Sequence, residues 1–397
     1  MTLPRLPVVR LKPKMDPRRI RFGHPWVYAN ELVMDRRTKA LEPGTVALLE
    51  DAGREPLGVI GFNAQSKIAG RVLSLDPETR IGGSWLAAKL DAALALREAI
   101  YDEPFYRLVH AEGDGLPGVV IDRFSETAVL QANAAWADQL KAQFAEALTA
   151  RGMPNVILNR AGRARVLEGL PELREVIAGA APSGPIPVPM NGAIYRADLM
   201  GGQKTGLFYD QRPNHAFLQS LLTGAPRVLD VFSHVGGFGL AAMAKGAGEV
   251  IAIDGSAAAL ELARQGADDM GAAARFHTRQ GDAFAQLEEA KGETFDVVIC
   301  DPPAFAPSKS ALDAGLRAYE RVARLAAPLV ASGGILCLCS CSHAADLAKF
   351  RAASLRGVGR AGRVGQLLHT GQAGPDHPQH TALAETGYLK SLFLRLR

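Results

Sequence analysis

The chain has 397 residues, of which 48% are hydrophobic and 22% are charged, and its formal net charge is +4. This ordinary globular composition excludes a disordered chain, a collagen and a small disulfide scaffold, and the length predicts two to four domains whose core needs no metal or disulfide. The charge is uneven, because residues 1–75 hold 13 Lys and Arg against 7 Asp and Glu, whereas the remainder holds 32 against 34. A basic N-terminal segment favours a polyanionic partner, nucleic acid before membrane, although a solvated basic face would give the same count.

The four cysteines all lie between Cys300 and Cys341, whereas a secreted disulfide framework would spread them along the chain. We therefore expect a reduced, cytoplasmic protein. The N-terminus is basic but lacks the apolar run of a signal peptide. The uncharged window 325–345 approaches the length of a membrane span, but Pro328 and the pair Gly333-Gly334 interrupt it. This window predicts a helix end, a turn and a buried strand, and no membrane partner is expected.

Three domains are predicted in chain order. Residues 1–75 alternate short apolar runs with Gly and Pro turns, which is typical of a small all-β module. Residues 76–186 are mixed, with a helix expected over 85–101 and a strand pair between 119 and 131. Prolines crowd the stretch 182–189, which predicts a linker. The third domain then occupies residues 187–397.

The third domain alternates predicted strands with predicted helices. The strands are expected at 227–232, 249–254, 295–300 and 334–339, and the helices at 257–270 and 316–330. Strands and helices that alternate at this spacing form a doubly wound, mostly parallel sheet. The sequence therefore predicts an α/β fold here.

Acidic residues follow successive predicted strands, at the edge where such sheets bind their ligands. Asp230, Asp254 and Asp282 occupy these positions. The glycines of 236–239 arrive several residues after the first strand, whereas a nicotinamide site needs them in the tight turn itself. S-adenosylmethionine fits better, with Asp254 accepting ribose hydroxyls and Asp282 facing the adenine edge. The alternative is that these aspartates only cap helices.

Two motifs indicate the reaction centre. The loop 301–305 (Asp-Pro-Pro-Ala-Phe) follows a buried strand and can present a carboxylate and an aromatic ring to a planar base. Cys341 falls just past the last predicted strand, whereas Cys337 and Cys339 are expected to be buried packing residues. Their spacing along one strand suits neither a tetrahedral metal site nor a disulfide. A thiolate at Cys341 can add to C6 of cytosine and make C5 able to accept a methyl group, although a packing role for Cys341 is the alternative.

In combination, these motifs resemble the bacterial 23S ribosomal RNA large-subunit methyltransferase I family, whose members are PUA domain-containing cytosine-5 methyltransferases. The resemblance covers nearly the whole chain. The segments that carry it follow in family order: 23–27, 43–44, 110–118, 122–124, 202–212, 230–239, 301–305, 340–342 and 376–378.

The resemblance implies a Rossmann-like class I methyltransferase domain at 187–397, a β-barrel PUA RNA-binding domain at 1–75 and a central α/β domain at 76–186. It implies methyl transfer from S-adenosyl-L-methionine to C5 of a cytosine in 23S ribosomal RNA, either naked or in an assembling subunit. Cys341 would attack C6, and Asp301 would hydrogen-bond the cytosine edge. The expected cofactor contacts are Phe232, Ser233, Gly236, Gly237, Asp254, Ser256, Asp282 and Asp301, and the expected substrate contacts are Lys204, Arg212, Pro303 and Phe305. RNA phosphates would be held by Lys12, Lys14, Arg18, Arg19 and Arg21.

Three positions depart from the family pattern. Ala304 stands where some relatives carry a second cysteine, His234 stands where Tyr is common, and His343 stands where Gly is common. Two other functions remain alternatives: a methyltransferase of the same fold that acts on a guanine nitrogen and needs no thiol, and a non-catalytic RNA-binding ribosome-assembly factor. The sequence also leaves a homodimer open.

Overall fold

A computed structural model describes residues 6–159, 162–172, 174–201 and 206–397. The chain forms two compact units. Unit 1 contains residues 6–183 together with Asp376–Ala384, and unit 2 contains residues 184–201, Gly206–Pro375 and Glu385–Arg397. The first two predicted domains fall almost entirely within unit 1, so the boundary between them stays a prediction.

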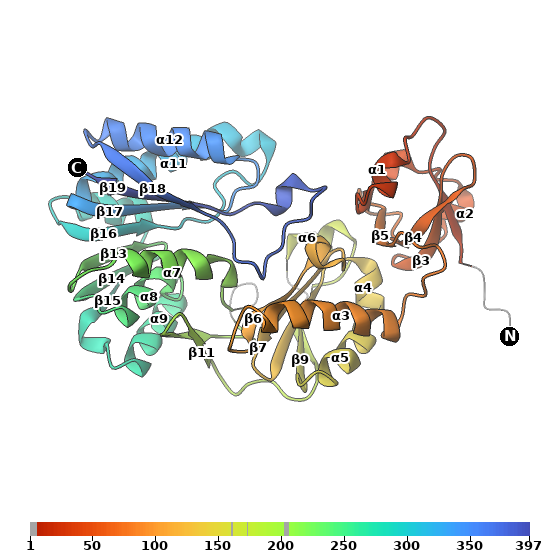
Figure 1. The fold of residues 1–397 in the computed structure, drawn as a ribbon, viewed down its shortest axis with the longest axis horizontal. Helices are drawn as coiled ribbons and strands as arrows, with labels where there is room; N and C mark the ends of the chain where they lie inside the picture. The colour runs from red at the N-terminus through yellow and green to blue at the C-terminus, as the bar shows by residue number, and fades with distance from the viewer. Residues whose placement is uncertain (1–5, 160–161, 173, 202–205) are drawn as a thin grey trace. The chain divides into compact units, whose positions relative to one another are not determined.

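Unit 1 begins with a five-stranded β-sheet whose strand order is β1-β3-β4-β5-β2 (Figure 1). Apolar side chains such as Val9, Leu49 and Ile60 are buried in one core cluster. The predicted all-β module is therefore confirmed, with two short helices in its loops. The elements are β1 (Val8–Arg10), α1 (Arg18–Arg21), β2 (Trp26–Val27), α2 (Arg36–Lys39), β3 (Thr45–Glu50), β4 (Pro56–Phe62) and β5 (Gly70–Ser74).

A second five-stranded sheet completes unit 1, in the order β10-β9-β8-β7-β6. The predicted strand pair is confirmed as the antiparallel hairpin β7–β8, and the predicted helix is α3. The elements are α3 (Gly83–Glu98), β6 (Phe105–His110), β7 (Val119–Phe124), β8 (Thr127–Ala132), α4 (Ala135–Gln139), α5 (Lys141–Thr149), β9 (Asn155–Asn159), α6 (Arg163–Leu167) and β10 (Arg174–Ala178).

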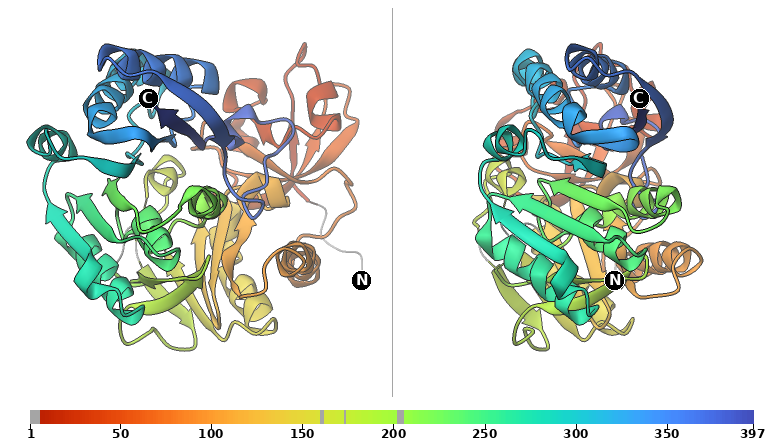
Figure 2. Two further views of the ribbon diagram at one scale, coloured as in Figure 1. Left: turned by 60° about the vertical axis from the view of Figure 1, so that its left-hand side comes forward. Right: turned by 90° about the vertical axis from the view of Figure 1, so that its left-hand side faces the viewer.

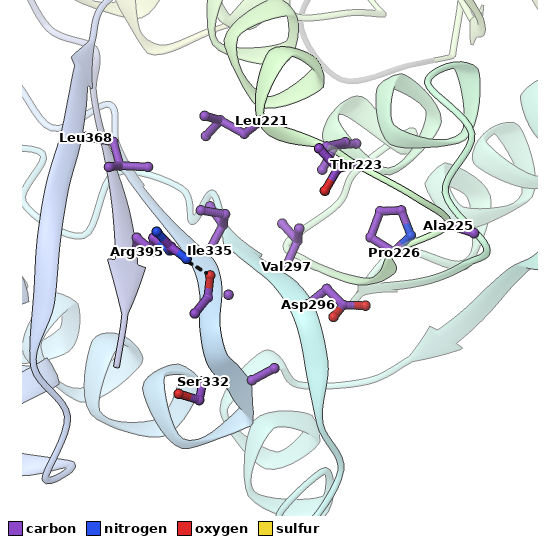
Figure 3. A pocket seen from close by; sticks show the side chains of 14 residues that line it. Leu221, Thr223, Ala225, Pro226, Asp296, Val297, Ser332, Ile335, Leu368 and Arg395 are labelled. Carbon is purple, nitrogen blue, oxygen red and sulfur yellow. Dashed lines mark hydrogen bonds between the residues drawn. The ribbon is translucent and has the colours of Figure 1, made fainter.

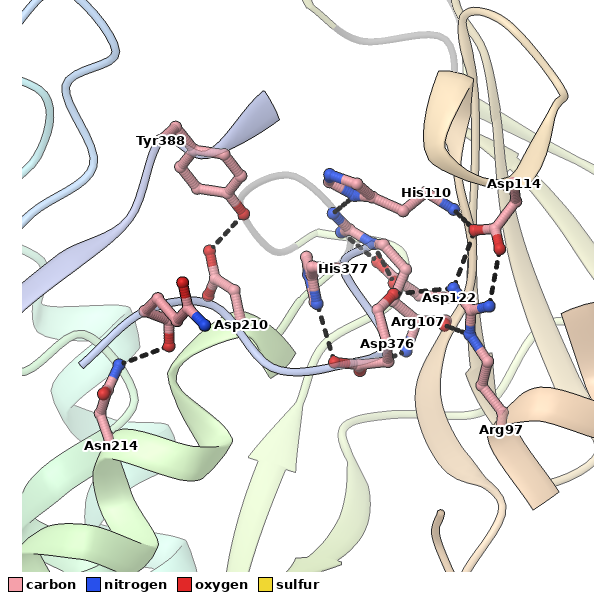
Figure 4. Close-up of polar contacts among 11 residues, drawn as sticks. Arg97, Arg107, His110, Asp114, Asp122, Asp210, Asn214, Asp376, His377 and Tyr388 are labelled. Atoms are coloured by element: carbon pink, nitrogen blue, oxygen red, sulfur yellow. Dashed lines mark hydrogen bonds and ion pairs between the residues drawn. The ribbon is translucent and has the colours of Figure 1, made fainter. Parts of the chain in front are cut away.

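A buried polar network attaches the distant segment Asp376–Ala384 to this second sheet (Figure 4). Arg97 donates to both carboxylate oxygens of Asp114 at 2.7 and 2.8 Å, and to the Asp376 carbonyl at 2.9 Å. The backbone N–H of Arg107 donates to the Asp376 carboxylate at 3.0 Å. A Cβ on Gly113 would stand 2.1 Å from the Pro378 carbonyl oxygen, so only glycine fits there. Two of the recognisable motifs, 110–118 and 376–378, thus serve packing within unit 1.

Unit 2 opens with a hairpin where the proline-rich stretch predicted a linker. Pro187 and Pro189 lie inside β11 (Ile186–Met190), which pairs antiparallel with β12 (Ala193–Ala197). The linker prediction is wrong for these residues, because both prolines sit two residues apart on an edge strand. Their missing N–H groups therefore fall on the same side of the strand, where no partner strand needs them.

The main sheet of unit 2 has seven strands in the order β15-β14-β13-β16-β17-β19-β18. Strands β13 to β17 are parallel to one another, whereas β19 runs antiparallel to both β17 and β18. The predicted mostly parallel Rossmann-like sheet is confirmed. The strands are β13 (Arg227–Val231), β14 (Glu249–Asp254), β15 (Phe276–Gln280), β16 (Phe295–Cys300), β17 (Val330–Ser340), β18 (Gly365–Gly371) and β19 (Lys390–Leu396).

Helices pack against this sheet, and α11 and α12 lie side by side (Figure 2). Leu287, Tyr319 and Phe350, from three of the helices, share one core cluster with the strands. The predicted helix 316–330 is displaced: it begins at Leu312 and ends at Ala326, because Pro328 cannot continue an α-helix. The helices are α7 (Arg212–Leu221), α8 (Gly237–Ala244), α9 (Ala257–Asp269), α10 (Ala283–Glu289), α11 (Leu312–Ala326) and α12 (Leu347–Arg360). None of the described helices is long and apolar enough to cross a membrane.

Candidate active site

The loop between β13 and α8 has a strained backbone. Phe232 (φ 62°) and His234 (φ 50°) adopt the left-handed conformation that residues other than glycine rarely take, and Gly236 (φ 83°) follows them. Strain of this kind concentrates at ligand-binding loops. Residues 232–236 separate the strand from the helix, so this loop is wider than the tight turn of a nicotinamide site, as predicted.

Asp254, at the end of β14, holds this loop in place. One carboxylate oxygen accepts a hydrogen bond from the His234 backbone N–H at 2.9 Å, and the other accepts from the Ser256 N–H at 2.8 Å. The Ser233 N–H donates to the Ile253 carbonyl at 3.0 Å. The carboxyl ends of β13 and β14 are thereby tied together at the edge where the cofactor was predicted.

Three buried polar atoms at this edge line one pocket and have no hydrogen-bond partner among the described residues: Asp230 Oδ1, Ser233 Oγ and His215 Nδ1. Buried polar groups are normally paired, so a cluster of unpaired ones marks where a polar ligand binds. Burial raises the pKa of Asp230 to about 7 and lowers the pKa of His215 to about 3. The ammonium and carboxylate of the methionine part of S-adenosylmethionine can supply the missing partners. A Cβ at Gly237 would lie 3.2 Å from His215 Nε2, so this glycine keeps the pocket open.

Most of the predicted cofactor residues meet at this edge. Phe232, Ser233, Gly237 and Asp301 line the pocket together with His215, a residue that sequence reasoning missed. His215 lies on α7 in a segment without a nucleotide-binding pattern, so no sequence signal marked it.

Two other predicted cofactor residues cap helices. The Ser256 hydroxyl accepts from the Ala259 N–H at 3.2 Å, and the Asp282 carboxylate accepts from the Ala285 N–H at 3.0 Å. The capping alternative is therefore confirmed for Asp282, and Ser256 caps α9 in the same way. The contacts of both residues with the cofactor stay predictions.

Asp301 follows β16 and is oriented by Gln211. The Asp301 N–H donates to the Val231 carbonyl at 3.2 Å, and its carboxylate accepts from Gln211 Nε2 at 2.9 Å. Gln211 is 4% exposed, and its own carbonyl oxygen accepts from Asn214 Nδ2 at 2.6 Å. Sequence reasoning included Gln211 in the motif 202–212 but assigned it no role. The side-chain amides of Asn214 and Gln211 are therefore linked in series to the Asp301 carboxylate, and these hydrogen bonds set its direction.

Cys341 lies directly after β17 and is the partly exposed member of the four cysteines, none of which forms a disulfide among the described residues. Its Sγ is 4.0 Å from the Pro302 carbonyl oxygen, which places it beside the loop that begins at Asp301. Cys300, Cys337 and Cys339 are 0–1% exposed, and burial raises the pKa of each of these thiols. The predictions that Cys337 and Cys339 are buried and that Cys341 falls past the strand end are confirmed, and Cys300 is buried as well.

Tyr319 of α11 links the cysteine loop to the Asp301 loop. The Ser340 hydroxyl donates to the Tyr319 oxygen at 2.8 Å, and the Tyr319 hydroxyl lies 2.7 Å from the Ser342 hydroxyl. Ser342 Oγ also accepts from the Ala306 N–H at 2.9 Å. These bonds hold the two reactive loops, the Cys341 loop after β17 and the Asp301 loop after β16, at a fixed separation. His343, in the first of these loops, is exposed.

The predicted substrate residues differ in exposure. Phe305 is partly buried and packs against Phe232, Phe284 and Tyr319 at ring separations of 6.1, 6.0 and 5.0 Å. Pro303 is exposed. Arg212 is only 8% exposed, and its guanidinium carbon lies 5.7 Å from the centre of the Tyr209 ring. Lys204 lies outside the described residues.

A larger hollow, of about 650 Å³, lies at the opposite, amino ends of β13, β16 and β17 (Figure 3). Its two charged side chains are already engaged: Arg395 donates to the Gly333 carbonyl at 3.2 Å, and Asp296 accepts from the Arg227 N–H at 2.8 Å. Because doubly wound sheets bind their ligands at the carboxyl ends of the strands, size alone does not make this hollow the reaction site.

Comparison with known proteins gives this arrangement a family. Residues 9–75 match the model of a PUA-like domain, and residues 174–357 match that of an S-adenosylmethionine-dependent methyltransferase. The chain is 35% identical to a ribosomal RNA large subunit methyltransferase of Deinococcus radiodurans over 392 residues, covering 95% of this chain and 94% of the relative. It is also 35% identical to the ribosomal RNA large subunit methyltransferase I of Aeromonas salmonicida over 381 residues, covering 94% and 96%. The chain belongs to the ribosomal RNA large subunit methyltransferase I family.

Solved structures agree on the fold. The crystal structure of SMU.776 complexed with SAH superposes with a TM-score of 0.81 at 18% identity, over 98% of this chain and 99% of the other. A SAM-dependent methyltransferase from Streptococcus mutans gives a TM-score of 0.80 at 17% identity, over 98% of this chain and 100% of the other. This member of the methyltransferase I family is therefore an S-adenosylmethionine-dependent enzyme with a PUA-like domain, as predicted.

Proposed function

We propose that this methyltransferase modifies C5 of a cytosine in 23S ribosomal RNA and that Cys341 is its nucleophile. The observation that carries the proposal is the position of the Cys341 thiol. It is the partly exposed cysteine, it follows β17 at the carboxyl edge of the sheet, and it lies against the loop of Asp301, which also lines the pocket of unpaired polar atoms. A methyltransferase acting on nitrogen has no need of a thiol there.

Cytosine C5 is a weak nucleophile, so the reaction needs help from the enzyme. In the proposed reaction, the Cys341 thiolate forms a bond to C6, and the electron pair of the C5–C6 double bond becomes available at C5. S-adenosylmethionine supplies an electrophilic methyl group to which C5 forms its new bond. Loss of the C5 proton to a base then restores the double bond and expels the thiolate.

Asp301 serves the same step from the opposite loop. In the proposed reaction its carboxylate, oriented by Gln211, accepts a hydrogen bond from the N4 amino group of the base and so orients the ring for attack at C6. Phe305, held in a cluster of rings, offers an aromatic contact to a base that has left its helical stack. These roles need Cys341 and Asp301 on adjoining strand ends, which the sheet order β13-β16-β17 provides.

In this proposal, RNA is bound by the basic arm of unit 1, which is the segment 12–21 that holds two lysines and three arginines. Lys12, Lys14, Arg18 and Arg21 are exposed, and Arg19 is partly so. Arg19 and Arg21 form ion pairs with Glu31 and Asp51, whereas the described residues form no ion pair with Lys14 or Arg18. Lys12 also lacks a described ion pair, but its ammonium donates to the Asn30 carbonyl at 2.9 Å. Lys14 and Arg18 are therefore the cations most available to RNA phosphates.

The test is methyl transfer from tritiated S-adenosylmethionine to undermodified large-subunit ribosomal RNA, with Cys341→Ala beside the unaltered protein. We expect labelled 5-methylcytidine from the unaltered protein and none from the variant, after digestion of the RNA to nucleosides. Cys300→Ala, which removes a buried thiol, is the matched control and should stay active. Label on a guanine, or full activity of Cys341→Ala, would overturn the thiol mechanism. Cofactor binding without any transfer to RNA would favour the non-catalytic assembly factor.

A further inference from the structure

Lys390, the first residue of β19, is a buried cation that the proposed reaction does not yet use. The side chain is 6% exposed, and its Nζ donates to the backbone carbonyls of Ser342 and Ala345, both at 2.7 Å. These acceptors are neutral, and within the described part of the chain no carboxylate forms an ion pair with it. A buried ammonium is costly unless a negative charge offsets it. Lys390 therefore needs an anion that the resting hydrogen bonds do not supply.

Two groups near Lys390 can carry a negative charge, Cys341 and Asp346. Asp346 is exposed and already engaged, since it caps α12 through the Lys349 N–H at 2.8 Å and pairs with the Lys349 ammonium. Cys341 is adjacent along the chain, because it directly precedes Ser342, whose carbonyl accepts from the Lys390 ammonium at 2.7 Å. Three other ionisable groups lie near Cys341. The Asp301 carboxylate accepts from Gln211 Nε2 at 2.9 Å, burial raises the pKa of Tyr319, which keeps its phenol neutral, and His343 is exposed. The Cys341 sulfur is thus the anion that Lys390 is placed to stabilise.

We propose that Lys390 is a positioning residue that holds the Cys341 loop and keeps its sulfur in the thiolate form at neutral pH. The two bonds to Ser342 and Ala345 fix the loop and the ammonium in one geometry, and the thiol proton leaves to solvent. A neighbouring lysine is a known means of making a thiolate at lower pH. Burial lowers the pKa of Lys390 to about 8, so the cation is present below that pH. The importance of this pair for catalysis rests on the proposed function, but the pair itself can be measured without RNA.

The test uses the rate of alkylation by iodoacetamide as a function of pH, with the full-length protein and no RNA. The other cysteines are 0–1% exposed, so the fast-reacting thiol reports on Cys341, and Cys341→Ser gives the blank. We expect the alkylation rate of the unaltered protein to reach half of its maximum at a pH below about 8, whereas a free thiol would reach it at roughly 8.5. Lys390→Met should raise the midpoint by about one unit, which slows alkylation at pH 7 about tenfold. Lys390→Arg, which keeps the charge, should restore most of the rate.

Lys245→Met is the control, because it removes an exposed lysine at the end of α8, outside the cysteine loop, and it should leave the midpoint unchanged. Equal midpoints for Lys390→Met and the unaltered protein would overturn the proposal. Circular dichroism shows whether the Lys390→Met variant folds. If it does not fold, the unaltered protein alone tests the proposal, since an alkylation midpoint at or above that of a free thiol contradicts a stabilised thiolate. A shifted midpoint together with full methyl transfer by Cys341→Ala would keep the pair and reject Cys341 as nucleophile.

Discussion

At the scale of single residues, Asp230 shows how burial without a partner prepares a binding site. One of its oxygens accepts the Gly239 N–H at 2.8 Å and the other has no partner among the described residues, so burial raises its pKa to about 7. A carboxyl whose pKa is raised in the folded state is neutral below that value, and it costs stability when it ionises as the pH rises through about 7. A cationic ligand reverses this preference, because it favours the ionised carboxylate.

We therefore expect S-adenosylmethionine to bind more tightly at pH 8 than at pH 6. Isothermal titration calorimetry at the two pH values checks this, and Asp230→Asn should remove most of the difference. Asp296→Asn, at the other end of the sheet, is the control and should retain it. An affinity that falls with rising pH in the unaltered protein would show that the ligand cation does not meet Asp230.

Gln211 provides a second prediction at this scale, because it donates the described hydrogen bond to the Asp301 carboxylate. Gln211→Ala removes a bond to a charged group, which is worth about 1.5–3 kcal/mol, so we expect kcat for methyl transfer to fall roughly 10- to 100-fold. The affinity for S-adenosylmethionine should change much less. Gln219→Ala, which removes an amide from the same helix region but away from Asp301, is the control. Equal kcat values for the two variants would contradict the orienting role.

At the scale of secondary structure elements, the Tyr319 phenol helps to hold the two reactive loops, because it bonds the hydroxyls of Ser340 and Ser342 at the end of β17. Tyr319→Phe keeps the buried ring but leaves the Ser340 and Ser342 hydroxyls without their shared partner. A buried hydroxyl left unsatisfied costs about 1–3 kcal/mol, so the free energy of unfolding in urea should fall by that amount. Ser308→Ala removes an exposed hydroxyl pair and should have little effect. A loss of stability below about 0.5 kcal/mol, which is the scatter of surface substitutions, would mean that the loops are held by other contacts.

The elements also show how far the sequence could lead. Strands 249–254 and 295–300 were predicted with the bounds that the structure has, because continuous apolar, β-branched runs are typical of buried parallel strands. β11 was missed because proline signals a linker locally, and only its place at a sheet edge makes proline acceptable.

The residues of the candidate site also fall into two groups, those that the sequence could predict and those that it could not. Asp301 and Cys341 could be predicted because they follow recognisable strands. His215, Gln211 and Lys390 could not, because their roles arise from contacts between segments far apart in the chain. The pairing of Ser340 with Lys390 across β17 and β19 is one such contact.

At the scale of the whole molecule, the uneven charge gives the last prediction. The excess of Lys and Arg over Asp and Glu lies in residues 1–75, and Lys14 and Arg18 on its surface form no described ion pair. Cations that contact phosphates release counterions from RNA, so binding weakens as salt rises. Each lost phosphate contact should make the slope of log K against log salt less negative by about 1. The double variant Lys14→Gln/Arg18→Gln should therefore bind ribosomal RNA more weakly and with a slope shallower by about 2.

The slope can be measured by fluorescence anisotropy, which gives the affinity for a labelled fragment of large-subunit ribosomal RNA at salt concentrations from about 50 to 300 mM. Arg264→Gln/Arg321→Gln changes the net charge by the same amount but removes cations that are paired on the surface of unit 2. If binding followed net charge alone, both double variants would lose affinity equally. If the basic arm holds the phosphates, the first pair loses affinity and slope while the second keeps both. Because phosphate contacts position RNA without reading its sequence, kcat at saturating RNA should be the same in all three proteins.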